Sequence, residues 1–73
     1  MTDLVNHPAH YTQGGVECID AIRAALGDEG FAGYCRGAAI KYLWRAPHKG
    51  NAAEDYRKAR WYVDALIKHT EEG

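Results

Sequence analysis

The sequence predicts an all-α fold, in which a small three-helix domain follows an irregular N-terminal arm. Apolar residues recur three or four positions apart in three segments, which is the spacing of one helix face, and no segment carries the signals of a strand. Residues that stop and start helices separate these segments. We expect residues 1–15 to form the arm and residues 16–73 to form a single helical domain.

The arm carries two signals of irregular structure. Pro8 restricts the residue before it and has no backbone N–H to donate. The pair Gly14-Gly15 is a strong turn signal. The arm is therefore expected to end in a turn just before the first helix.

The first helix is expected over residues 16–26. Ile19, Ile22 and Leu26 share one face at helical spacing. Gly27 then ends the helix, because glycine adopts the left-handed conformation that commonly follows a helix C-terminus.

The second helix is expected over residues 31–46, and Pro47 ends it. Its apolar stripe consists of Phe31, Tyr34, Cys35, Ala38, Tyr42 and Leu43. Ile40 and Trp44 add apolar surface outside that stripe, which is typical of a helix that contacts more than one partner.

The third helix is expected over residues 52–70. Asn51 is a good N-cap and Glu54 follows it by three residues, as in a capping box. The stripe expected to face the core consists of Tyr56, Ala59, Val63, Leu66 and Ile67. Trp61 is expected on the outer face among charged residues, where an oligomer interface or a stacking ligand would explain it.

Composition narrows the classes of function. The net charge is −1 and the pI is about 6.4, so bulk electrostatics gives no reason to expect binding to long nucleic acid. No apolar run is long enough to cross a membrane, and the N-terminus lacks the features of a signal peptide. We expect a cytosolic protein with Cys18 and Cys35 reduced. We also expect a homo-oligomer, because the apolar surface exceeds what three short helices can hide.

A cluster of basic residues forms a candidate phosphate site. Lys41 and Arg45 are four residues apart, so both project from one face of a helix, and Lys49 follows in the loop. That loop leads into a helix N-terminus, where free N–H groups favour anions. The alternative is that these are solvated side chains paired with Glu54 and Asp55.

Aromatic and histidine residues leave further alternatives open. Tyr42, Trp44 and Trp61 could stack on a nucleobase, although aromatic residues at helical spacing are more often core or interface. His7 and His10 form an H-x-x-H pair that could bind zinc with a cysteine, but the pair is a weak signal and no C-x-x-C is present. The histidines are better explained by packing of the arm or by hydrogen bonds to a ligand.

No catalytic motif is evident. The chain has no phosphate-binding G-x-x-x-x-G-K-[ST] loop, no arrangement suggesting a Ser-His-Asp triad, and no paired E-x-x-E and E-x-x-D of a helical pyrophosphohydrolase. Its acidic residues could hold Mg²⁺ beside phosphates, or could simply cap helices. These residues are Glu17, Asp20, Glu54 and Asp55.

Three motifs together resemble a small family found mainly in bacteriophages, the domain of unknown function DUF3310. They are HPAHY, GGVECIDAI and IKYLWRAPHKGNAAEDYRKARWYV, and the resemblance covers residues 6 to about 67. Ala38 departs from the family pattern, which often has Asn there, and Tyr56 replaces the usual Leu. Longer relatives of this family are described as phage nucleotide kinases, so the resemblance implies a nucleotide ligand and the cytoplasm of an infected bacterium.

The resemblance also implies roles for individual residues. Lys41, Arg45 and Lys49 would neutralise phosphate, Tyr11 or Trp44 would stack the base, and Glu17 or Asp55 would hold Mg²⁺ or accept a proton. His10 and Lys58 complete the candidate set. Whether the chain is a nucleoside monophosphate kinase stays open. The alternatives are a non-catalytic sponge for cyclic or modified nucleotides and a helical module that binds another protein through Trp61.

Overall fold

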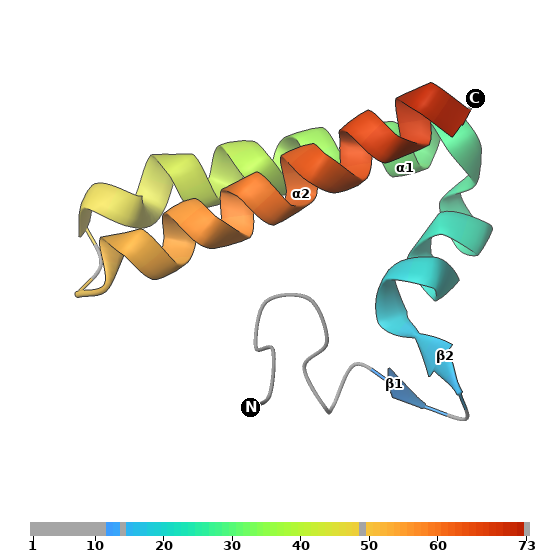
Figure 1. The fold of residues 1–73 in the computed structure, drawn as a ribbon, viewed down its shortest axis with the longest axis horizontal. Helices are drawn as coiled ribbons and strands as arrows, with labels where there is room; N and C mark the ends of the chain where they lie inside the picture. The colour runs from blue at the N-terminus through green and yellow to red at the C-terminus, as the bar shows by residue number, and fades with distance from the viewer. Residues whose placement is uncertain (1–11, 14, 49, 73) are drawn as a thin grey trace.

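A helical hairpin dominates the structure, a computed structural model that describes residues 12–13, 15–48 and 50–72. The elements are β1 (Thr12–Gln13), β2 (Val16–Glu17), α1 (Cys18–Arg45), the 3₁₀ turn η2 (Ala46–His48) and α2 (Ala52–Glu72). Figure 1 shows most of α1 running alongside α2. The two short strands lie at the N-terminal end of α1, away from the paired part of the helices. The expected helical class is confirmed. The expected boundary of the arm at residue 15 stays a prediction, because residues 1–11 lie outside the described part.

A short hairpin precedes the helices, although no strand was expected. β1 and β2 pair antiparallel, with Thr12 opposite Glu17 and Gln13 opposite Val16. Gly15 has φ 80°, a conformation that glycine adopts without strain, so the expected turn is confirmed at this residue. The turn brings its flanking residues together as a two-residue ladder, and α1 consequently begins at Cys18 rather than at residue 16.

The expected three separate helices are not confirmed, because the first two are joined in α1. Gly27 is a non-helical residue inside α1, with φ 73° and ψ 179°. Residues 18–26 form the first limb of α1, and residues 28–45 form its second limb. Figure 1 shows the first limb turned away from the direction of the second limb. Gly27 therefore interrupts the helix with the positive φ that was expected there, and the helix resumes after it in a new direction.

The connection to α2 follows the local signals closely. Pro47 lies in η2, directly after α1 ends at Arg45. Asn51 accepts a hydrogen bond from the Glu54 backbone N–H through its Oδ1, at 3.1 Å. Its Nδ2 donates to Glu54 Oε2 at 3.2 Å, so the two side chains bond to each other as well. This reciprocal cap confirms the predicted start of α2.

Small side chains line the seam between the second limb of α1 and α2. The buried apolar residues are Phe31, Cys35, Ala38, Ala39 and Ala46 on the α1 side and Ala59 on α2. Four of these six are alanines, which allow two helix backbones to approach closely. Cys18 and Cys35 are both free thiols, and burial raises the pKa of the Cys35 thiol.

Several residues expected in the core lie at the surface instead. Leu43 is 52% exposed, Tyr56 48% and Ile67 50%, whereas Asp55 and His69 are buried. The stripe of α2 that meets α1 consists of Asp55, Ala59, Tyr62, Leu66 and His69. It shares Ala59 and Leu66 with the expected stripe and differs from it in the other three residues. Trp61 is half-buried rather than on an outer face. Apolar residues occupy more than one side of α2, so periodicity alone could not select the side that meets α1.

Among the described residues, no helix is both long enough and apolar enough to cross a membrane.

The conformation of Gly27 yields a stability prediction. Only glycine readily adopts this combination of φ and ψ, so we expect Gly27→Ala to lower the free energy of unfolding by about 1–3 kcal/mol. Gly33 is a matched control, because it has a helical conformation within α1 and an added Cβ would meet no atom within 4 Å. We expect Gly33→Ala to raise the free energy of unfolding by about 0.5–1 kcal/mol. Urea unfolding followed by circular dichroism measures both, and equal effects at the two sites would contradict the structure.

Candidate functional site

Three cationic side chains converge on the ring of Tyr42. Lys41 Nζ lies 4.4 Å from the ring centroid, the Arg45 guanidinium carbon 4.8 Å and Lys58 Nζ 5.5 Å. We call this group of three cations around Tyr42 the cationic cluster. Cations are attracted to the face of an aromatic ring, which helps to offset their mutual repulsion.

Both helices contribute to the cationic cluster. Lys41 and Arg45 are one helical turn apart on α1, and Lys58 approaches the same ring from α2. Tyr42 is held in place by Tyr62 of α2, since the two rings stack with centroids 5.8 Å apart and planes inclined by 15°. The cluster therefore depends on the packing of α1 against α2.

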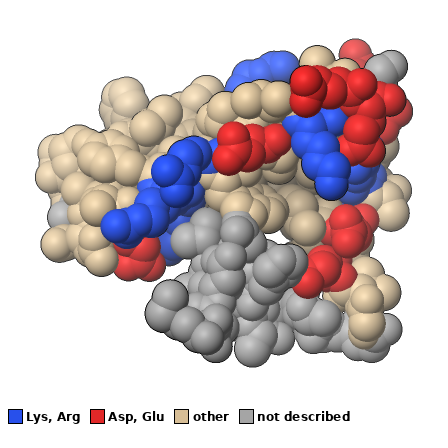
Figure 2. Space-filling model, viewed as in Figure 1, with Lys and Arg blue, Asp and Glu red and all other residues tan. Residues whose placement is uncertain are grey.

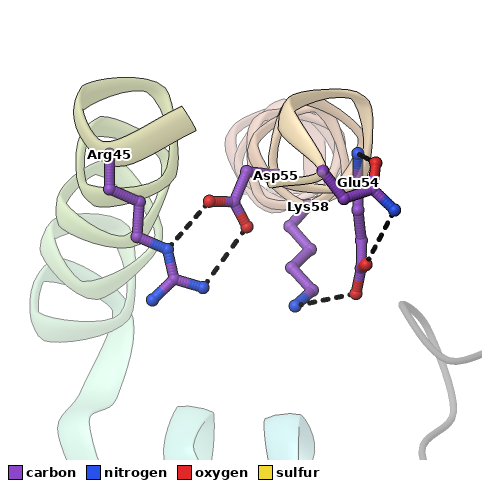
Figure 3. A network of polar contacts seen from close by, with 5 residues as sticks. Arg45, Glu54, Asp55 and Lys58 are labelled. Atoms are coloured by element: carbon purple, nitrogen blue, oxygen red, sulfur yellow. Dashed lines mark hydrogen bonds and ion pairs between the residues drawn. The ribbon is translucent and has the colours of Figure 1, made fainter. Parts of the chain in front are cut away.

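An ion pair across the seam fixes Arg45. Arg45 Nε donates to Asp55 Oδ2 at 2.9 Å, and its second nitrogen, Nη2, donates to Oδ1 at 3.3 Å. Figure 3 shows the guanidinium reaching from α1 to the carboxylate on α2. Asp55 is only 2% exposed, whereas the Arg45 side chain is 39% exposed. The hydrogen bond to Asp55 raises the pKa of the Arg45 guanidinium above its ordinary value.

Lys58 is paired as well, but the cluster keeps a net positive charge. Lys58 Nζ lies 3.3 Å from Glu54 Oε1, one turn earlier on α2 (Figure 3). The alternative in which Lys41, Arg45 and Lys49 pair with Glu54 and Asp55 is thus observed for Arg45, whereas Glu54 pairs with Lys58. Three cations against two carboxylates leave one positive charge. Lys41 is exposed and forms no ion pair with another described residue, so it is available to an anion.

The other predicted site residues do not all lie near the cationic cluster. Trp44 is 82% exposed, next to Arg45 in the sequence but without a ring contact to the described residues. Glu17 ends β2, which lies beyond the bend at Gly27 and well away from the connection between α1 and α2 (Figure 1). His10, Tyr11 and Lys49 lie outside the described residues, and their roles stay predictions.

The two predicted catalytic acids do not come together. Asp55 is engaged by Arg45, which makes it a residue that positions a cation, and Glu17 lies in β2, directly before α1 begins. Within the described ranges, no group of three His, Cys, Asp or Glu side chains is placed to hold a metal ion. These residues therefore offer no preformed magnesium site.

Sequence interpretation missed the part played by tyrosines. Tyr34, Tyr42 and Tyr62 form a ladder across the seam, with the hydroxyls of Tyr34 and Tyr62 3.4 Å apart and their rings edge to face. Tyr42 was expected as core or as a stacking residue, yet it is the platform on which the cations gather. The available signal was its position between Lys41 and Arg45, one residue after the first and three before the second.

The Arg45–Asp55 pair predicts unequal effects of removing its two partners. Arg45→Gln leaves a buried carboxylate without its guanidinium, whereas Asp55→Asn leaves a guanidinium that water can reach. We expect Arg45→Gln to lower the melting temperature by about 10 °C and Asp55→Asn by about 5 °C. The double variant should fall between the two. A larger loss for Asp55→Asn in thermal unfolding would contradict the observed burial.

Comparison with known proteins agrees with the resemblance seen in the motifs. The model of the family described as protein of unknown function DUF3310 matches residues 5–64. The chain is 39% identical over 69 residues to the gene 1.7 protein of Enterobacteria phage T3, covering 89% of this chain and 42% of that protein. It is 36% identical over 69 residues to the protein named nucleotide kinase gp1.7 of Escherichia phage T7, covering 89% of this chain and 35% of that protein.

The chain thus spans less than half the length of these two relatives. No solved structure matches it significantly. The family match extends over most of the chain and includes the three cations of the cationic cluster. This chain belongs to the DUF3310 family.

Proposed function

We propose that the chain binds nucleotides through their phosphates at the cationic cluster. The observation that carries this proposal is the convergence of Lys41, Arg45 and Lys58 on one tyrosine ring, with one net positive charge remaining. The name of the T7 relative, a nucleotide kinase, supports the same class of ligand. We infer that this binding takes place in the cytoplasm of an infected bacterium.

Each of the three cations would contact the phosphates in a different way. Lys41 is exposed and would approach a phosphate directly, as a mobile point charge. Arg45 is held by Asp55 and would present its remaining N–H donors in a fixed direction. Lys58 would exchange its contact with Glu54 for the ligand, at little cost because surface ion pairs are weak.

Phosphoryl transfer would require more than this cluster. Two substrates must be aligned and the developing charge neutralised, commonly by Mg²⁺. Because the described residues offer no preformed site, Mg²⁺ would enter with the phosphates of the nucleotide. Glu17 and Asp55 remain the proposed acids, although Asp55 already holds Arg45. That engagement favours, as a second candidate, a non-catalytic protein that retains a linear or cyclic nucleotide unchanged.

Ligand binding is tested by thermal melting with nucleoside mono-, di- and triphosphates and cyclic dinucleotides, with and without Mg²⁺. We expect at least one nucleotide to raise the melting temperature, and Lys41→Ala to remove most of that shift. Arg36→Ala is the matched control, because it deletes one exposed cation from the same helix outside the cluster. Chromatography of each stabilising ligand then separates turnover from retention. No shift with any nucleotide would overturn the proposal.

We also propose that the chain self-associates through an apolar face. Leu43 directly follows the packed Tyr42 on α1, and Tyr56 and Val63 directly follow the packed Asp55 and Tyr62 on α2. Each is therefore rotated about 100° from the seam in the same sense. In an antiparallel pair, such residues lie on the same side. Lys41, Glu54 and Trp61 directly precede packed residues and so lie on the opposite side.

This apolar face is large for a protein of this size. Its exposed members are Ile40 at 57%, Leu43 at 52%, Tyr56 at 48%, Val63 at 40% and Ile67 at 50%. Contiguous apolar patches of this kind usually mark an interface. A second copy is the occupant we propose, because two hairpins meeting face to face would form a four-helix bundle and leave both cationic clusters outside.

Self-association is checked by light scattering coupled to size-exclusion chromatography. We expect a mass of at least twice the 8.1 kDa of one chain, and expect Val63→Lys to reduce it toward 8.1 kDa. Glu71→Lys introduces the same side chain at an exposed position of α2 and should leave the mass unchanged. A monomeric parent protein would refute this part of the proposal.

A further inference from the structure

A hollow lies between the first limb of α1 and the last turns of α2, and it opens to the surface. Its volume is about 290 Å³, at the low end of the range for small-molecule sites, so one large side chain is an occupant of suitable size. The residues that matter for its chemistry are Ile19 and Asp20 of the first limb, Phe31 of the second limb, and Trp61, Asp64 and Ala65 of α2.

Aromatic rings form much of the wall of the hollow. Phe31 is only 3% exposed, and its ring meets the His69 ring edge to face, with centroids 5.0 Å apart. Trp61 is half-buried, and the Tyr62 ring holds it in the same manner, at 4.9 Å. A further aromatic ring would gain edge-to-face or offset-stacked contacts with such a wall. The hollow therefore suits an aromatic side chain.

The charged residues around the hollow leave two carboxylates unengaged. The side chains of Asp20 and Asp64 are in exposed residues and form no ion pair with another described residue, whereas Arg23 lies 3.8 Å from Glu72. With Lys68, three carboxylates and two cations line the hollow, so its net charge is −1. A buried Trp normally needs an acceptor for its indole N–H, and either free carboxylate could accept that hydrogen bond.

Trp44 is the side chain that best matches this hollow. It is the most exposed of the large apolar side chains in the described part of the chain, at 82%. It follows Tyr42 of the seam by two residues and is rotated about 200° from it, so it projects away from α2. Trp is enriched at protein interfaces, where its large ring is removed from water. A partner for Trp44 therefore has to come from outside the described residues.

Trp44 and the hollow of the same chain lie too far apart to meet. Arg45, the next residue, pairs with Asp55, and the part of α2 that lines the hollow begins six residues later, at Trp61. Six residues of helix span about 9 Å, and Trp44 projects away from α2. Another copy of the chain is thus needed to bring an indole of this kind to the hollow.

Charge favours such a contact between copies. Lys41 lies one turn before Trp44 and is exposed, at the end of the molecule where the cationic cluster keeps one net positive charge. The hollow carries one net negative charge. Figure 2 shows basic side chains gathered nearer the connection of the helices and acidic side chains among the basic ones toward the end of α2. The two ends of the molecule are therefore complementary to each other.

We propose that Trp44 of one copy inserts into the hollow of a second copy, with its ring against Phe31 and Trp61 and its indole N–H donating to Asp20 or Asp64. The inserting and receiving surfaces differ, so the contact is head to tail and repeats from copy to copy. It is separate from the apolar face of Leu43 and Val63, and it does not depend on nucleotide binding. One inserted side chain buries little area, so the contact alone is weak.

Mixing two defective variants tests this contact. Both carry Val63→Lys to disable the apolar face; one adds Trp44→Ala and keeps its hollow, and the other adds Ala65→Phe, which fills the hollow and keeps Trp44. In sedimentation equilibrium at high protein concentration, we expect each variant alone to be a monomer of 8.1 kDa and the equimolar mixture to form a complex of twice that mass. A mixture that stays monomeric would overturn the inference.

The indole signals then locate the contact. The Ala65→Phe variant is labelled with ¹⁵N and titrated with the unlabelled Trp44→Ala variant, whose own spectrum identifies the Trp44 signal by its absence. We expect the Trp44 indole N–H signal to move to lower field as it donates to a carboxylate. Association without any change in this signal would refute insertion. Leu26→Ala is the matched control for Trp44→Ala, because Leu26 is 49% exposed and lies outside the hollow.

The same variants separate the two interfaces. A lower mass with Val63→Lys, and no further effect of Trp44→Ala at any concentration, would refute the head-to-tail contact and keep the apolar face. A lower mass with Trp44→Ala and none with Val63→Lys would do the reverse. Circular dichroism checks that each variant is folded. Should Ala65→Phe unfold, Asp64→Lys replaces it, because Asp64 is exposed and a lysine there would repel Lys41 of the incoming copy.

Discussion

The close packing of α1 against α2 along a seam of alanines is the constraint on which the rest of the structure depends. Two helices placed side by side bury only one stripe each, and here the stripe is filled mainly by Ala38, Ala39, Ala46 and Ala59. Small residues bring the backbones close enough for Arg45 to reach Asp55 across the seam. The same approach stacks Tyr42 on Tyr62. The cationic cluster is a consequence of this packing.

A narrow seam also decides what remains outside. Large apolar side chains that are rotated one way from the seam form the face with Leu43 and Val63. On the other side, Lys41, Arg45 and Lys58 surround the ring of Tyr42. A helical hairpin of this kind has two unequal sides. In the proposed self-association, the apolar side would supply the stability that one seam does not, because small chains commonly gain stability by oligomerisation. The opposite side would then stay free for the proposed ligand.

The sequence predicted the local features well and the long-range ones less well. The cap formed by Asn51 and Glu54, the end of α1 before Pro47 and the break at Gly27 depend on neighbouring residues, so the signals are complete within a few positions. The side of α2 that meets α1 depends on residues far apart in sequence. Ala59 and Leu66 belong to both possible stripes, and Tyr56, Val63 and Ile67 extend them on one side as plausibly as Asp55, Tyr62 and His69 do on the other. Only the partner helix decides between them, and it selected the stripe with smaller and more polar residues.

The candidate site divides in the same way. Lys41 and Arg45 could be grouped from their spacing, since one helix holds both. Lys58 came only from family resemblance, and its place beside Tyr42 required the packed pair of helices. The hollow gave no recognisable signal, because its lining comes from both limbs of α1 and from α2, which only the bend and the packed helices bring together.

The bend at Gly27 connects these observations. A straight α1 would continue past α2 and leave no space between its first limb and the end of α2. With the bend, the Asp28 carbonyl meets His69 Nε2, and Arg23 meets both Phe31 and Glu72. These contacts hold the first limb over the end of α2 while a hollow remains between them. The conformation of Gly27 thus gives this two-helix protein two different ends. The cationic cluster lies near the connection of the helices, where α1 packs against α2. The hollow lined by Phe31, Trp61 and His69 lies at the other end, beside the bend.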